Sequence, residues 1–294
     1  MRVNLRWSRV AKVSLLYLGA MLAFVYLTGP FVWLVSSSLQ TETALLSVPP
    51  KWIPNPVSLE SYAGLLRGAL TGETAGTAYQ VRIFPRSLLN SLIVAASVAV
   101  AAVAAGAYAA YPLARLRFRG KNAVMFLILG TRMMPALAIA VPFYLAARFV
   151  GMLNRLETLV IINLSFILPY VIWLLRAYFQ SIPEDLEDAG RMDGCTRGQV
   201  VRLIILPLSL PGLVAAGILA FMLTWGEFFF ALILTSSEAA YTSTVVAAMF
   251  ATDVDIDYVA MIAAGVLSVI PPVLVALTFQ KYIVSGLLAG SVKG

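Results

Sequence analysis

The 294-residue chain is too apolar for a soluble globular domain, because 61% of its residues are hydrophobic and only 12% are charged. Its net charge of +7 is compatible with nucleic-acid binding, but in a membrane protein excess lysine and arginine records orientation, so no nucleic-acid partner is expected. The single cysteine, Cys195, and the absence of histidine exclude an internal disulfide framework, histidine-based triads and most zinc sites.

The first predicted element is a membrane helix that follows a basic amino-terminal segment. Residues 1–12 carry four positive charges, and an apolar run begins directly after them. This run is long enough to cross a bilayer, and no clear small-residue cleavage site follows it. The pattern therefore predicts a retained first span and not a signal peptide.

The rest of the chain continues this pattern of long apolar segments. A membrane helix needs about 20 mostly apolar residues. Six stretches meet that requirement, at about 13–37, 88–113, 123–147, 157–176, 208–233 and 259–280. The sequence therefore predicts an all-α polytopic membrane protein with about six transmembrane helices.

The distribution of positive charge predicts how these spans are oriented. With the amino terminus inside, most of the 21 lysines and arginines fall on the inside, and the outer loop 234–258 has acidic residues only. That loop also has an apolar run, Val245–Phe250, that favours a short helix. The predicted organisation is a cytoplasmic segment 1–12, a transmembrane domain 13–280 and a cytoplasmic tail 281–294, with both termini in the cytoplasm.

Small residues and helix breakers recur inside the predicted spans. Alanine and glycine fill much of the second span from Ala95 to Ala110, and prolines interrupt several others, among them Pro135 and Pro142. Small residues allow close helix packing, and breaks in membrane helices are tolerated mainly where helices pack together or line a cavity. Simple packing is one interpretation; a moving helical bundle around a path is the one we favour.

The loop between the fourth and fifth spans has the chemistry of two short helices. Ser181 and Glu184 have capping-box spacing, acidic residues crowd the following turn, and Gly194 can adopt the left-handed conformation that ends a helix. Thr196 and Gln199 repeat the capping-box spacing for a second helix, and Pro207 marks the turn into the next span.

The first of these helices has a narrow face of mostly small side chains. Leu186, Ala189, Gly190 and Asp193 lie at positions i, i+3, i+4 and i+7. The segment has a net negative charge, so an anionic membrane surface would repel it, whereas a basic cleft on another protein would attract it. The alternative is a solvated hairpin that merely joins two spans.

This loop resembles the cytoplasmic signature of binding-protein-dependent ABC importer permeases, Glu-x-Ala-Ala-x-x-Asp-Gly followed by a proline. The matching residues are Glu187, Ala189, Gly190, Asp193, Gly194 and Pro207, and Gly190 stands where the family usually has alanine. The resemblance implies a MetI-like type I importer fold in which these residues couple to an ATPase. It further implies that Glu187 pairs with a basic residue of the ATPase and that Gly194 permits the bend between the helices.

Three other stretches resemble the carbohydrate subgroup, and in particular its smaller permease. They are 131–144, 221–228 and the tail 280–294, with Gly226 replacing the usual asparagine of the second stretch. The tail implies a sugar as cargo, such as trehalose, maltose or a related oligosaccharide. Other small polar solutes, such as glycerol phosphate, stay open.

Two ionisable residues lie inside predicted spans. Arg132 and Glu227 are candidates for the solute pathway, because charged groups at membrane depth usually face the bundle interior. Placement at the membrane interface is the alternative, since each lies near a span end. Trp225 belongs either to a sugar-stacking wall or, as is more common for aromatics in a span, to helix packing.

The chain has no phosphate-binding G-x-x-x-x-G-K-[ST] motif, so we expect ATP and magnesium to be bound by separate subunits. The resemblance implies a non-catalytic subunit without cofactor or metal, in a bacterial or archaeal cytoplasmic membrane. The implied partners are a second permease forming a heterodimer, two ATPase subunits and an external solute-binding protein. The alternative classes are an ion-driven secondary transporter, which would leave the loop unexplained, and a membrane-embedded enzyme, whose acidic residues would not cluster in loops.

Overall fold

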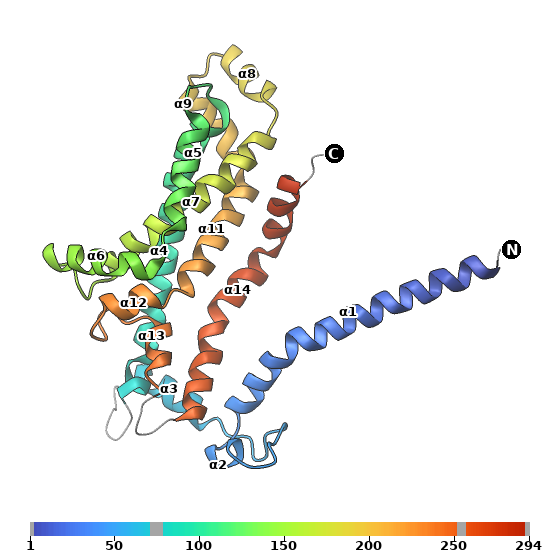
Figure 1. The fold of residues 1–294 in the computed structure, drawn as a ribbon, viewed down its shortest axis with the longest axis vertical. Coiled ribbons are helices and arrows are strands. Elements are labelled where there is room, and N and C mark those ends of the chain that lie inside the picture. Colours follow the sequence, from blue (N-terminus) through green and yellow to red (C-terminus); the bar gives the residue numbers. More distant parts are fainter. Residues whose placement is uncertain (1–2, 71–78, 252–256, 292–294) are drawn as a thin grey trace. The chain divides into compact units, whose positions relative to one another are not determined.

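A computed structural model describes residues 3–70, 79–251 and 257–291 of the chain. Within these ranges the structure is helical and has no β-strand (Figure 1). The chain divides into two units, unit 1 with Met1–Arg82 and Met249–Leu267, and unit 2 with Ile83–Ala248 and Ser268–Gly294.

Four helices are long and apolar enough to cross a membrane. They are α1 (Val3–Ser38), α4 (Tyr79–Arg115), α7 (Leu156–Ser181) and α14 (Tyr258–Ser291). They contain the first, second, fourth and sixth predicted spans, each extended at one or both ends. The helices α4 and α14 contribute residues to both units.

The remaining two predicted spans are not continuous helices, which corrects the prediction for 123–147 and 208–233. The first is a pair bent by 89°, with Lys121–Met133 before the bend and Ala136–Phe149 after it. The second bends by 75° between Arg197–Leu208 and Leu210–Trp225. If each bent pair is one span, the described residues hold up to six spans, as predicted.

Proline explains the first bend. The helix α5 (Lys121–Gly130) and a 3₁₀ turn η1 (Thr131–Met133) precede it, and α6 (Ala136–Phe149) follows it. Met134 and Pro135 have extended backbone, with ψ values of 125° and 130°. A residue before proline is sterically pushed out of the helical region, so the helix ends before Pro135 and a new one begins after it.

Short elements surround the second bend. They are α8 (Asp185–Met192), α9 (Arg197–Val200), a π-helical turn η2 (Val201–Ile205) and α10 (Leu206–Leu208). The helix α11 (Leu210–Trp225) then ends at Gly226, and α12 (Phe229–Leu234) begins after a short break. The break between α11 and α12 falls inside the predicted fifth span and was not expected from hydrophobicity, because both sides of it are apolar.

The centre of unit 2 is built on close helix contacts that need small residues. Along α4 the fully buried positions are Ala95, Val98, Ala102, Gly106 and Ala110, spaced by three or four residues. A methyl group at Gly106 would lie 2.7 Å from Val171 Cγ1 of α7, and one at Gly212 of α11 would lie 2.5 Å from the Tyr178 ring of α7. Helices α4, α7 and α11 therefore run side by side (Figure 1), and the small-residue prediction for the second span is confirmed as packing.

At the α12 end of unit 2, aromatic and amide groups hold the loops. Phe143 of α6, Phe166 of α7 and Phe230 of α12 form a cluster with ring centroids 5.0 to 6.0 Å apart. The helix α13 (Ser243–Ala248) lies in the outer loop, where a short helix was predicted from Val245–Phe250. Its predecessor segment is fixed by Asn154, whose Oδ1 accepts the backbone N–H groups of Ser236 and Ser237.

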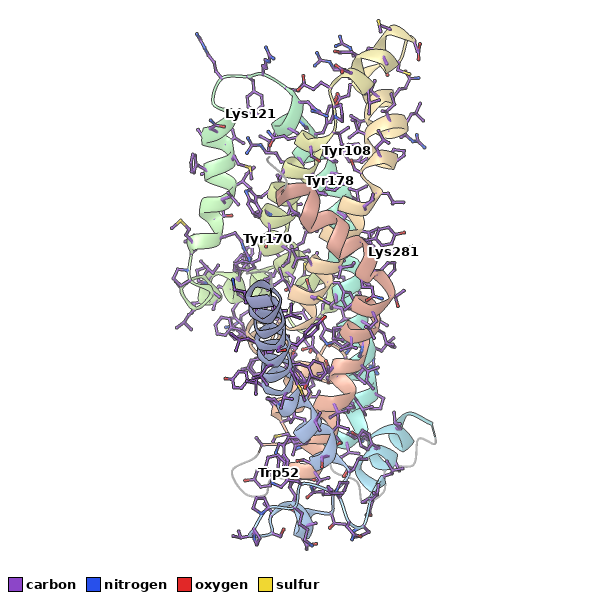
Figure 2. The ribbon with its side chains drawn as sticks, turned by 90° about the vertical axis from the view of Figure 1, so that its right-hand side faces the viewer. Trp52, Tyr108, Lys121, Tyr170, Tyr178 and Lys281 are labelled. Carbon is purple, nitrogen blue, oxygen red and sulfur yellow. The ribbon has the colours of Figure 1, made fainter. Side chains whose placement is uncertain are left out.

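Unit 1 contains α1, α2 (Glu42–Leu45), α3 (Glu60–Leu70) and the irregular segment between α2 and α3. Trp52 of this segment stacks against Trp33 of α1 with ring centroids 4.7 Å apart (Figure 2), and its carbonyl accepts a hydrogen bond from the Ser36 hydroxyl. Buried Gln40 donates to the Lys51 carbonyl. The proline-rich stretch after α2 is thus irregular, as predicted, yet tied to the end of α1.

Candidate functional site

The segment 181–207, called the hairpin below, folds into the two short helices that its sequence predicts. The helix α8 ends at Met192, and Gly194 has a φ of +90°, the left-handed conformation expected there. The second capping box is confirmed: the Thr196 N–H donates to Gln199 Oε1 at 2.8 Å, and the Gln199 N–H donates to Thr196 Oγ1 at 3.4 Å. Together these features fix the turn between α8 and α9.

The first capping box is wrong. Ser181 is the last residue of α7, and its hydroxyl donates to the Tyr178 carbonyl in that helix. The N-cap position of α8 is Glu184, and no side chain caps it. The spacing of Ser181 and Glu184 matched the motif, but α7 continues past its predicted end and uses the serine.

The narrow face predicted on α8 is divided between two environments. Glu187 and Gly190 are buried, whereas Leu186, Ala189 and Asp193 are exposed. A methyl group at Gly190 would collide with the tip of the Ile204 side chain in η2. The hairpin therefore closes on itself at Gly190 and presents Leu186 and Ala189 outward.

Glu187 is held by two side chains of α4. Its Oε1 lies 2.5 Å from Arg115 Nε, and its Oε2 accepts a hydrogen bond of 2.8 Å from the Tyr111 hydroxyl. The Arg115 contact is an ion pair and not an aligned hydrogen bond, since neither atom meets hydrogen-bond geometry. Both side chains of the pair are nearly buried, with exposed fractions of 7% for Arg115 and 11% for Glu187.

Arg115 also binds the junction between α7 and α8. Its Nη2 donates to the Ile182 carbonyl at 2.6 Å, and its Nη1 lies 3.6 Å from Glu184 Oε1. The Glu184 carboxylate is 71% exposed, so this second ion pair contributes little. The guanidinium thus joins the end of α4 to the junction and to α8 at once, a geometry that its planar fork of donors allows.

Two further cations bind the carboxyl-terminal end of α4. Arg176 Nε of α7 donates to the Leu113 carbonyl at 3.0 Å. Lys121 Nζ donates to the carbonyls of Ala114 and Leu116 at 3.1 and 3.3 Å. Lys121 begins α5 at the same end of unit 2 as the hairpin (Figure 2). These carbonyls have no partners within the helix, and positive charge at a helix carboxyl terminus is favourable, so the cations cap α4.

The two pathway candidates occupy different places, and no hydrogen bond or ion pair of the described residues joins them. Arg132 lies exposed in the 3₁₀ turn at the bend between α5 and α6. The Glu227 carboxylate accepts the backbone N–H groups of Phe230 at 2.7 Å and Ala231 at 3.1 Å. Glu227 therefore caps α12 across the break, a local use of its charge that was not foreseen.

Trp225 has a packing role, the more common of the two that its sequence context allowed. Its ring stacks on Phe221 at 5.6 Å, and its Nε1 donates to the Ser268 carbonyl. The side chain lies in a buried cluster with Ala95 of α4. Its faces are thus occupied within unit 2.

Tyr111 and Arg115 are the residues of this site that sequence reasoning missed. Arg115 counted only as one of the positive charges that record orientation, and Tyr111 lies in an apolar span without a distinguishing motif. The available signal was on α8, where Glu187 shares a helix face with small Gly190. A carboxylate on a face that packs inward requires a cationic partner from another helix.

Comparison with known proteins places this geometry in a class. Residues 102–288 match the family described as binding-protein-dependent transport system inner membrane component. This range covers the hairpin, the helices that pack against it and both bends. The chain therefore belongs to this family of membrane-spanning ABC transporter permeases.

Individual relatives align over nearly the whole chain. The trehalose transport system permease protein SugB of Mycobacterium tuberculosis is 36% identical, over 92% of this chain and 93% of its own length. The trehalose/maltose transport system permease protein MalG of Thermococcus litoralis is 34% identical, over 97% and 98%. The solved structure of a bacterial ABC transporter involved in alginate import has a chain with a TM-score of 0.73 at 22% identity, covering 93% of this chain and 96% of that chain, which shows the shared fold.

Proposed function

We propose that this chain is one membrane-spanning subunit of an ATP-driven sugar importer and forms half of the translocation path. The observation that carries the proposal is the hairpin, in which α8 has one face bound to its own chain and the other face free. Buried Glu187 and Gly190 fix the helix from within, while Leu186 and Ala189 remain exposed. Such an outward face of small and aliphatic residues is suited to a cleft on another protein.

The partner at this face is an ATPase subunit. The exposed acidic residues Asp185 and Asp188 of α8 favour a basic cleft, since complementary charge directs association. In this proposal the residues Ala189, Asp193, Gly194 and Pro207 shape the contact surface and its turns. Glu187 and Gly190 act behind that surface, so the implied pairing of Glu187 with an ATPase cation is replaced by its pairing with Arg115.

The remaining features of the assembly follow from the family and from the charge pattern. The hairpin and both termini lie in the cytoplasm, a second permease completes the path, and a solute-binding protein delivers the cargo from outside. ATP and magnesium belong to two ATPase subunits, and this chain performs no catalysis. The relatives named for trehalose and maltose transport support a di- or oligosaccharide as cargo.

Reconstitution tests this function. The chain would be placed in liposomes with the permease, ATPase and binding protein encoded by neighbouring genes, and uptake of labelled trehalose, maltose and glycerol phosphate would be measured. We expect uptake of a disaccharide that requires internal ATP and the binding protein. Uptake of glycerol phosphate alone would replace the cargo, and uptake driven by an ion gradient without ATP would overturn the importer.

A further inference from the structure

The contacts of Glu187 lead to an inference that deepens the proposed function and rests on it in one respect, the role of the hairpin in coupling. We propose that Glu187 is a positioning residue that fastens α8 to the end of α4 through Arg115 and Tyr111. Through this latch, defined as the side chains of Glu187, Arg115 and Tyr111, a displacement of α8 moves α4 as part of the same rigid body.

The connectivity of the chain shows why such a fastening matters. Along the chain, α8 is joined to α7 by the short segment Ile182–Glu184 and to α11 through α9, η2 and α10. No covalent connection leads directly from α8 to α4, because Arg115 and Glu187 lie 72 residues apart in sequence. A force on α8 therefore reaches α4 directly only through side chains, and the latch supplies three of them.

The chemistry of the latch favours a fixed arrangement. Each Glu187 oxygen has its own partner, and the Arg115 guanidinium also binds the Ile182 carbonyl. Separating the pair would leave two nearly buried charges without counter-charges, which is strongly unfavourable. A lysine at position 115 would keep the charge but would lack the fork that reaches both α8 and the junction.

The latch also lies where a movement of α4 has consequences. The α4 helix carries the stripe of small residues that packs closely against α7 at Gly106. Because packed interfaces of this kind have few alternative arrangements, a shift at one end of α4 is transmitted along the helix and not absorbed locally. The latch thus connects the ATPase-facing hairpin to the core of the permease without passing through α7.

A spin-label distance tests the latch independently of transport. In a Cys195→Ser background, labels would be placed at exposed Val100→Cys on α4 and exposed Met192→Cys on α8 in the full assembly. We expect one narrow distance distribution that is unchanged between nucleotide-free and ATP-bound states. A Glu187→Gln or Arg115→Lys variant should broaden it and make it depend on nucleotide. A distribution that stays narrow in both variants, or that shifts with nucleotide in the wild type, would overturn the latch.

A double-mutant comparison then tests whether Glu187 and Arg115 act as one unit. Glu187→Gln and Arg115→Gln should each lower ATPase stimulation by the loaded binding protein about tenfold, and the double variant should lose no more than either single variant. Losses that multiply would show that Glu187 acts on a different partner. Tyr111→Phe, which removes one hydroxyl, serves if the charge variants do not assemble, with Tyr108→Phe on the exposed side of α4 as its control. A wild type without stimulated ATPase would refute the proposed function, whereas the distance width in the nucleotide-free assembly would still decide the latch.

Discussion

The two ends of unit 2 are held together by different chemistry. At the hairpin end, charged groups of Arg115, Glu187, Arg176 and Lys121 bind one another and the carbonyls that end α4. At the α13 end the corresponding work is done by neutral groups: buried Asn90 donates to the carbonyls of residues 238, 239 and 241, and Ser91 pairs with Ser243. The difference teaches that the positive charges which record orientation also fasten helices, so the charged end is the one built to transmit force.

Breaking the charged end should have the largest effect. Arg115→Met leaves Glu187 buried without a cation, and we expect the assembled permease to lose about 3–5 kcal/mol of stability, because a buried charge loses its partner. The control is Arg117→Met, which removes an exposed arginine two residues away. Thermal unfolding of the two purified assemblies compares them, and equal midpoints would contradict a structural ion pair at Arg115.

Breaking the neutral end should cost less and leave coupling intact. Asn90→Ala removes the donor to three backbone carbonyls, and we expect a loss of about 1–3 kcal/mol, as for buried acceptors left without partners. ATPase stimulation per folded transporter should stay near the wild-type value, because this network is remote from the hairpin. If Asn90→Ala uncoupled ATP hydrolysis while Arg115→Met did not, the comparison of the two ends would be reversed.

The turn of the hairpin allows a smaller and more local test. Thr196→Ala removes the N-cap of α9, and we expect a loss of about 1 kcal/mol of stability. Thr196→Ser keeps the hydroxyl and should behave like the wild type. Hydrogen exchange of the amides of residues 197–200 would report the loss, and protection equal in both variants would show that the capping box is dispensable.

Gly190 should show the smallest net effect, because two contributions oppose each other. An alanine favours the helix by about 1 kcal/mol over glycine, but its methyl group would collide with the Ile204 tip. We expect Gly190→Ala to be close to neutral alone and stabilising in combination with Ile204→Val, which removes the colliding atom. Melting temperatures of the two single variants and the double variant measure this, and simple additivity would show that the two side chains do not meet.

Sequence reasoning predicted the local features of this protein better than its long-range contacts. The Thr196–Gln199 cap, Gly194 and the helix near Val245 all depend on neighbouring residues, and the structure confirms them. Apolar length predicted the four long helices for the same reason. Hydrophobicity could not show the break between α11 and α12, because the residues on both sides of it are equally apolar.

The contacts of the site depend on residues far apart in the chain, which a single sequence does not bring together. Nothing local indicates that Arg115 meets Glu187 or that Glu227 folds back onto the N–H groups of α12. The signature did predict which loop is important, but not which of its residues face inward. The structure supplies that division by burying Glu187 and Gly190 while exposing Ala189.

The most direct test of the central claim is ATP-driven disaccharide uptake by the reconstituted transporter with Ala189→Arg in this chain. The substitution places a bulky cation on the exposed face of α8 and leaves the buried latch untouched. The account predicts loss of ATPase binding and at least about a tenfold loss of uptake, since one buried like charge at a docking surface costs several kcal/mol. Ala189→Ser should retain both, and full uptake by the Ala189→Arg transporter would contradict the account.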